Sequence, residues 1–127
     1  MAYIEVQQAT RQFKNGEQVT VANRDISFEV DQGAVVVILG PSGAGKSTLL
    51  NILGGMDSPT SGRVLVDGVD IAQFNSRQLT TYRRQAVGFV FQFYNLVPNL
   101  TARENVELAS QITKDARDVD ETLALVG

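Results

Sequence analysis

The stretch that decides the fold reads Gly40-Pro41-Ser42-Gly43-Ala44-Gly45-Lys46-Ser47, followed by Thr48. It fits the phosphate-loop pattern G-x-x-x-x-G-K-[ST], which has a strand before it and a helix after it. The preceding residues 34–39 form a short apolar run rich in β-branched side chains, which predicts a strand buried on both faces. Apolar residues then recur at helical spacing over 49–53, and Gly54-Gly55 predicts the end of that helix.

The chemistry of this loop predicts a phosphate site. Its glycines let successive backbone N–H groups turn inward, and a helix that starts near Gly45 adds unpaired donors and a positive dipole end. Lys46 is expected to reach the β- and γ-phosphates, and the Ser47 hydroxyl is expected to ligate Mg²⁺. The alternative is a glycine turn that only joins a strand to a helix. We favour the phosphate site because eight positions and both flanking segments fit the pattern.

Composition excludes several classes of function. The chain has 127 residues, enough for one domain with a core, and its net charge of −3 argues against non-specific nucleic-acid binding. It contains no cysteine and no histidine, which excludes disulfides, thiolate chemistry and imidazole catalysis. The longest apolar run has six residues, and the N-terminus lacks the layout of a signal peptide. We expect an intracellular chain without a nucleic-acid partner.

The front of the chain alternates between apolar and polar residues, as half-buried strands do. Residues 3–8 are predicted to form a strand that continues through 11–13, and Asn15-Gly16 is a strong turn signal. A return strand is expected at 19–21, and the alternation over 26–30 predicts another half-exposed strand. These segments predict an antiparallel meander that leads into the buried phosphate-loop strand, so the class is α/β with a β-sheet attachment.

Turn and cap signals divide the rest of the chain. Asn75 or Ser76 caps one helix, and Thr101-x-x-Glu104 is a capping box that starts another. The predicted elements are strands at 63–68 and 87–91 and helices at 76–85, 102–112 and 118–126.

Two features of this part have competing interpretations. Asp67 follows an apolar run, as the second magnesium motif of phosphate-loop enzymes does, but Gly68 comes next and we assign Asp67 to a turn. Three arginines on the helix at 76–85 are either phosphate contacts or part of a solvated face, and we favour the solvated face. They are Arg77, Arg83 and Arg84.

Two linked stretches, 40–68 and 87–106, carry a family resemblance. Together they resemble the ATP-binding cassette (ABC) transporter ATPases, whose glutamine loop is similar to Val87-Gly88-Phe89-Val90-Phe91-Gln92. The resemblance spans nearly the whole chain and is most similar to the lipoprotein-releasing and macrolide-exporting branch. It implies a phosphate-loop NTPase core on a parallel sheet, with an antiparallel β subdomain. The implied parts of 1–127 are the β subdomain at 1–33 and 62–70, the core at 34–56 and 86–92, and the start of the helical subdomain at 93–127.

The resemblance also implies roles for single residues. It assigns Lys46 and Gln92 to catalysis, and Ser47 and Gln92 to Mg²⁺, with Gln92 beside the attacking water. The alternative for Gln92 is an ordinary polar strand end. Phe13 matches the aromatic residue that the family places against adenine, although Phe13 in the core and Tyr3 in its place are rival interpretations. The residues implied to bind the ATP phosphates are Gly40, Pro41, Ser42, Gly43, Ala44, Gly45, Lys46, Ser47 and Thr48.

Other elements of the family are absent from these residues. The sequence contains no L-S-G-G-Q stretch, no histidine, and no apolar run ending in Asp-Glu after Gln92. In the family these elements lie downstream, so the chain is expected to be the N-terminal part of a cassette, cut within the helical subdomain, that binds ATP without hydrolysing it. Segments 34–39 and 87–91 would then lack neighbouring strands and favour aggregation.

The resemblance implies partners for the intact protein. It would be an ATPase subunit that pairs head to tail with a second ABC ATPase domain and drives a transmembrane permease. It would be peripheral on the cytoplasmic face of the cell membrane. Two rivals stay open: a nucleotide-binding module without catalysis, and a non-transport ABC ATPase that acts in DNA repair or translation.

Overall fold

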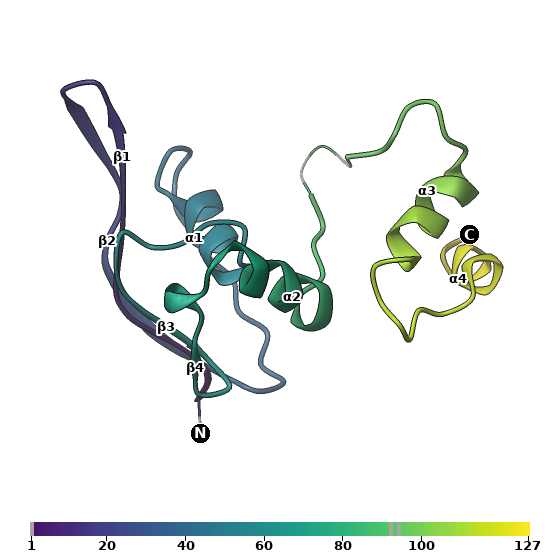
Figure 1. Cartoon of the computed structure of the whole chain (residues 1–127), viewed down its shortest axis with the longest axis horizontal. Helices are drawn as coiled ribbons and strands as arrows, with labels where there is room; N and C mark the ends of the chain where they lie inside the picture. The colour runs from purple at the N-terminus through teal and green to yellow at the C-terminus, as the bar shows by residue number, and fades with distance from the viewer. Residues whose placement is uncertain (1, 92, 94) are drawn as a thin grey trace. The chain divides into compact units, whose positions relative to one another are not determined.

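The computed structural model describes residues 2–91, 93 and 95–127, which divide into two units. The first unit extends to Arg83 and holds a sheet, the phosphate-loop helix and most of a second helix. The second unit starts at Arg84 and holds two further helices (Figure 1). Each unit is described separately below.

The sheet is antiparallel and has the strand order β2-β1-β3-β4. Strands β1 (Ala2–Asn15) and β2 (Gln18–Asp31) form one long hairpin that turns at Gly16 and Glu17, as the Asn-Gly signal predicts. Strands β3 (Ser61–Val66) and β4 (Val69–Asp70) extend the sheet beyond β1. The antiparallel meander predicted from the alternation of residues is confirmed, although the predicted short strands merge into two long ones.

The long hairpin bends where its pairing is irregular. The register between β1 and β2 shifts at several points between Val6 and Gln12, and Gln8 has a positive φ of 49°. Such bulges increase the local twist and change the direction of a strand. Pairing of β1 with β3 reaches Thr10, opposite Ser61. Beyond that point the hairpin continues as a two-stranded ribbon, visible at the upper left of Figure 1.

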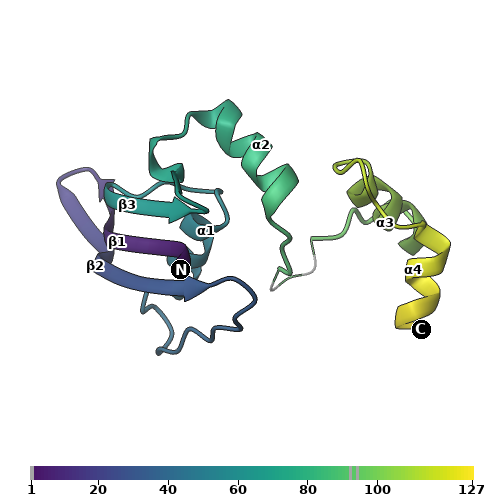
Figure 2. The same ribbon diagram turned by 90° about the horizontal axis from the view of Figure 1, so that it is seen from below.

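The core lies between one face of the sheet and helix α1 (Lys46–Leu53), which is behind the sheet in Figure 2. The alternation of the strands places their apolar residues on this face, and Leu49 and Ile52 of α1 are buried. The helix ends at Gly54, as the Gly-Gly pair predicts. The buried cluster consists of Val6, Ala9, Ile52, Val64, Val66 and Ile71, the last from the short helix η1 (Ile71–Gln73).

Helix α2 (Ser76–Ala86) holds the C-terminal end of α1. Tyr82 Oη donates a 2.7 Å hydrogen bond to the Leu53 carbonyl, and burial raises the pKa of this phenol, with a smaller contribution from Tyr3. Arg83 Nη1 donates to the Gly55 carbonyl at 2.7 Å. Arg83 therefore satisfies a carbonyl at a helix end, where a cation is favourable, whereas Arg77 and Arg84 are exposed as predicted.

The strand predictions at 34–39 and 87–91 are wrong for this chain. Both segments are irregular and belong to no strand in the part of the chain that the structure describes. Val35 is 93% exposed, Leu39 is 87% exposed, and Val90 is fully exposed. A parallel strand buried on both faces requires a hydrogen-bonded neighbour, and no described strand pairs with either segment. Their apolar sequences are therefore exposed here.

In the second unit, helix α3 (Ala102–Ser110) begins with the predicted capping box between Thr101 and Glu104. The backbone and side chain of Thr101 lower the pKa of the Glu104 carboxyl. Helix α4 (Val119–Val126) is capped by the carboxylate of Asp118 and matches its prediction. None of the helices in the described ranges is both long and apolar enough to cross a bilayer.

One arginine joins the two helices of the second unit. Arg103 on α3 binds Glu107 on the same helix at 2.6 Å and Asp120 on α4 at 2.9 Å. The hydrogen bond from Arg103, followed by its charge, lowers the pKa of the Asp120 carboxyl. The carboxylates of Asp120 and Glu107 raise the pKa of the Arg103 guanidinium. Arg103 and Asp120 therefore form an ion pair that links α3 to α4.

Candidate phosphate-binding site

The predicted phosphate loop leads directly into the first turn of α1. The Ala44 N–H donates to the Pro41 carbonyl at 3.1 Å, and Gly43 has a φ of 82°, which glycine adopts without strain. Gly45 is the N-cap of α1 with a φ of 88°, also in the left-handed region. The loop 40–45 is therefore a tight turn that delivers the chain into a helix, as its glycine spacing predicts.

The N-terminus of α1 presents unpaired backbone donors. The first hydrogen bond within the helix runs from the Leu49 N–H to the Gly45 carbonyl at 3.0 Å, so the N–H groups of Lys46, Ser47 and Thr48 precede it. Among the residues described, no side-chain hydrogen bond caps this terminus, and its first turn holds no acidic residue. A lysine in the first turn is unfavourable beside the positive helix end unless an anion compensates both charges. These features fit an anion such as a phosphate.

Strand β2 fixes the loop at Gly45. A Cβ added to Gly45 would lie 2.2 Å from the carbonyl oxygen of Ala22 and 2.7 Å from Asn23 Nδ2. The same Nδ2 donates to the Gly45 carbonyl at 3.1 Å, and Asn23 is 5% exposed. Gly45 is therefore required by close packing as well as by its backbone conformation. Sequence reasoning missed Asn23, because an asparagine between Ala22 and Arg24 is typical of a turn and gives no signal of a buried contact.

Lys46 and Ser47 lie together at the start of α1. Lys46 Nζ donates to the Gly40 carbonyl, so the side chain folds back over the loop. The Ser47 side chain is exposed at the same helix end. A hydroxyl oxygen suits Mg²⁺, but the described residues form no cluster of three or more potential metal-binding side chains. The donor set therefore fits a hard cation that takes most of its ligands from bound phosphates.

Phe13 lies on β1 within the ribbon, near the residues of β2 that contact the loop. Arg11 pairs with Asn23 across the hairpin, and Phe13 is two residues further along the same strand. The Phe13 ring is 42% exposed, and the Arg11 guanidinium lies 4.5 Å from its centroid. The interpretation of Phe13 as a core residue does not fit this exposure. An exposed ring remains consistent with stacking on a base.

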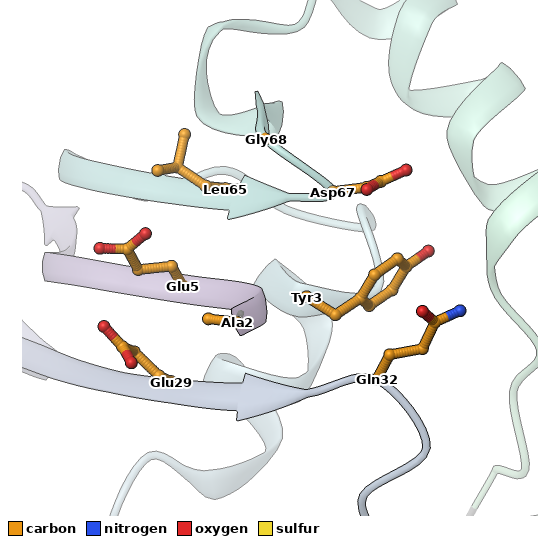
Figure 3. A pocket seen from close by; sticks show the side chains of 8 residues that line it. All are labelled: Ala2, Tyr3, Glu5, Glu29, Gln32, Leu65, Asp67 and Gly68. Carbon is orange, nitrogen blue, oxygen red and sulfur yellow. The ribbon is translucent and has the colours of Figure 1, made fainter.

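Tyr3, the rival of Phe13, lies at the far end of β1 from the ribbon. It lines a cavity of about 630 Å³ together with Glu5, Glu29 and Asp67 (Figure 3). Glu5 and Glu29 face each other directly across β1 and β2. Acidic walls repel a polyphosphate, and none of the loop residues 40–48 lines this cavity. Tyr3 therefore lies beside an acidic cavity that the phosphate loop does not line.

Two further sequence predictions complete the account of the site. Asp67 lies in the turn between β3 and β4 with a φ of 50°, so its assignment to a turn is confirmed. Gln92 lies outside the described residues, so its roles beside Mg²⁺ and the attacking water stay predictions. The structure places the start of α1 against β2 at Gly45, and Phe13 lies two residues beyond Arg11, the residue that pairs with Asn23.

Comparison with known proteins agrees with this geometry. A family model described as "ABC transporter" matches residues 23–127. An uncharacterized ABC transporter ATP-binding protein from Thermotoga maritima is 55% identical over 93 residues, which cover 73% of this chain and 40% of that protein. The macrolide export ATP-binding/permease protein MacB from Brucella abortus is 47% identical over 105 residues, covering 83% of this chain and 16% of MacB.

The fold is likewise similar to solved cassettes. The dimeric, post-hydrolysis structure of the ATP-binding cassette MJ0796 with ADP and Pi matches with a TM-score of 0.83 and 40% identity. This match covers 93% of the present chain and 51% of that cassette. The α/β class and the cassette fold are confirmed by it. The chain spans about half the length of MJ0796 and a smaller share of the curated relatives named above.

Proposed function

We propose that loop 40–48 binds the triphosphate of ATP, because this chain belongs to the ABC transporter family. One observation supports this most directly: the uncapped N-terminus of α1 carries Lys46 in its first turn and is held by β2 through Gly45. In this proposal the backbone N–H groups of the loop surround the phosphates, and Lys46 exchanges the Gly40 carbonyl for phosphate oxygens.

The remaining contacts follow from the positions of the other site residues. Ser47 would hold Mg²⁺ together with the phosphates, and Gln92 is proposed as a further ligand that also contacts the attacking water. Mg²⁺ bound there would neutralise part of the negative charge of the phosphates. The exposed ring of Phe13 would stack on adenine, which the position of the ribbon beside the loop supports.

For the intact protein we propose an ATPase subunit that couples ATP hydrolysis to transport. The dimer of MJ0796 supports a second ABC ATPase domain as partner, and the similarity to MacB, an ATP-binding/permease protein, supports a permease. Such a subunit would lie on the cytoplasmic face of the membrane. The 127 residues themselves include no histidine and no Asp-Glu after an apolar run beyond Gln92, so we propose that they bind ATP without hydrolysing it.

Calorimetric titration of the 127-residue chain tests the phosphate assignment. The charged hydrogen bonds of Lys46 are worth about 1.5–3 kcal/mol, so Lys46→Ala should weaken binding of ATP and of tripolyphosphate by about ten- to a hundredfold. Lys114→Ala is the matched control, because Lys114 is an exposed lysine of the second unit. Equal affinities for wild type and Lys46→Ala would refute the assignment.

The same titration tests the adenine contact separately. Phe13→Ala should weaken ATP by about fivefold or more, since base stacking contributes about 1–3 kcal/mol, and should leave tripolyphosphate unchanged. GTP should lose affinity to a similar extent, because stacking does not discriminate between purines. An unchanged affinity for ATP would remove Phe13 from the site without affecting the assignment of Lys46.

A further inference from the structure

Arg11 occupies the neck of the ribbon and touches both Phe13 and the segment that follows α1. Its Nε lies 3.0 Å from Asp57 Oδ2, and its guanidinium lies 4.5 Å from the centroid of the Phe13 ring. The Arg11 side chain is 26% exposed and that of Asp57 is 30% exposed. An isolated ion pair at this exposure contributes little to stability. Arg11 also contacts the Phe13 ring, so the ion pair connects Asp57 to that ring.

The neighbours of Arg11 are tied to the same segment, 57–60. The Thr60 N–H donates to the Thr10 carbonyl at 2.7 Å, and the Gln12 N–H donates to Thr60 Oγ1 at 2.9 Å. Three successive residues of β1 therefore contact this short connector. Both the backbone and the Arg11 side chain therefore hold the base of the ribbon against the connector.

The connector is in turn fixed to α1. The N–H groups of Met56 and Asp57 both donate to the Asn51 carbonyl, at 2.8 and 3.2 Å. A continuous series of contacts therefore runs from the phosphate-loop helix through Asp57 and Arg11 to the Phe13 ring. The two ends of the proposed nucleotide site are connected within one unit of the structure.

We infer that Arg11 is a positioning residue for adenine, which orients the Phe13 ring and leaves its opposite face for the base. This inference rests on the proposed stacking of Phe13. A planar guanidinium stacks on a ring face, which a lysine ammonium does not do, and the charge of Asp57 holds the guanidinium near the ring. A ring that is ordered before ATP arrives loses less side-chain freedom when the base binds.

Fluorescence anisotropy tests the positioning without any nucleotide. The chain contains no tryptophan, so Phe13→Trp provides a single indole reporter on the ribbon. We expect Arg11→Ala in this background to lower the anisotropy, because the indole loses its stacking partner, and Arg11→Lys to give an intermediate value. The matched control is Arg63→Ala, which removes an arginine paired with Asp70 at 3.7 Å on the same sheet and should leave the anisotropy unchanged.

Titration of the Phe13 chain then tests the consequence for binding. Arg11→Ala should weaken ATP by about two- to fivefold, the effect of one cation–π contact, and leave tripolyphosphate unchanged. Arg11→Lys should recover part of the loss, since it keeps the charge opposite Asp57. A merely structural role would weaken both ligands equally, and that result overturns the inference.

The outcomes separate the inference from the proposed function. If Phe13→Ala leaves ATP affinity unchanged, the adenine contact is wrong, whatever the anisotropy shows. If Phe13→Ala weakens ATP but Arg11→Ala leaves the anisotropy unchanged, the adenine contact stands and the role of Arg11 is wrong. Should Arg11→Ala fail to fold, Arg11→Lys decides: an anisotropy equal to that of the arginine chain overturns the inference, and a lower one supports it.

Discussion

Replacing Gly45 with alanine tests the packing of the phosphate loop against β2. The new Cβ would lie 2.2 Å from the Ala22 carbonyl oxygen, a backbone atom that cannot move alone. The backbone of Gly45 also has a φ of 88°, which disfavours any L-residue. Two separate penalties therefore act at this position, one from conformation and one from contact.

Gly43 provides a control that isolates the contact. Its φ is 82°, but no described atom lies within 4 Å of an added Cβ. Gly43→Ala should therefore cost only the left-handed backbone term, about 1–2 kcal/mol of unfolding free energy. Gly45→Ala should cost that term plus about 1–3 kcal/mol for overpacking, or about 2–5 kcal/mol in total. The loss of freedom in the unfolded chain is common to both substitutions and cancels in the comparison.

Urea unfolding of the nucleotide-free chain, followed by circular dichroism, measures this difference. We expect Gly45→Ala to be less stable than Gly43→Ala by about 1–3 kcal/mol, a large share of a typical 5–15 kcal/mol. In an Asn23→Ala background most of the difference should persist, because the shorter contact is with the Ala22 carbonyl. Equal unfolding free energies for the two alanine variants would show that β2 does not constrain the loop.

Three other expectations follow from the structure. The lowered pKa of Asp120 means that its pairing with Arg103 stabilises the fold above the ordinary aspartate pKa and is lost as the pH falls through the folded value. Acidification in that range should therefore loosen α4, which circular dichroism would detect. Asp120→Asn should remove this part of the pH dependence, and identical pH profiles for wild type and variant would contradict the expectation. The exposed apolar segment 34–39 should make the isolated chain self-associate in light scattering, and Val35→Lys should reduce the association; a monomeric wild type would refute this. Phosphate release from ATP by the 127 residues should not exceed the background, and sustained turnover would show that the catalytic assignment is wrong.

Local signals in the sequence were enough to predict much of the fold. Gly16, with a φ of 65°, starts the two-residue turn at Gly16 and Glu17, and few other residues tolerate that backbone angle, so the hairpin follows from it. The capping box of Thr101 and Glu104 fixes the start of α3 in the same way. The start of α1 follows from the glycine pattern of the loop. Each of these predictions depends on interactions between residues close together in the chain.

Specific contacts between distant side chains were not predicted. The lack of neighbouring strands at 34–39 was expected from the family resemblance alone, because the composition of the segment predicts burial and does not report its partners. Asn23 contacts Gly45 across 22 positions, and Arg11 contacts Asp57 across a gap about twice as long. A lone asparagine or arginine carries no signal of its partner, so the elements that hold the site together appear only in three dimensions.

The contacts of the connector 57–60 determine where the chain can accept inserted peptides. Its Asp-Ser-Pro-Thr sequence is typical of a permissive surface loop. Asp57 and Thr60 nevertheless hold the neck of the ribbon, so an insertion between them would separate the ion pair from the backbone bonds beside it. The turn at Gly16 has no described neighbour within 4 Å of an added Cβ. An epitope tag or a reporter peptide therefore belongs at the ribbon tip, where the chain can lengthen without breaking the contacts of the connector.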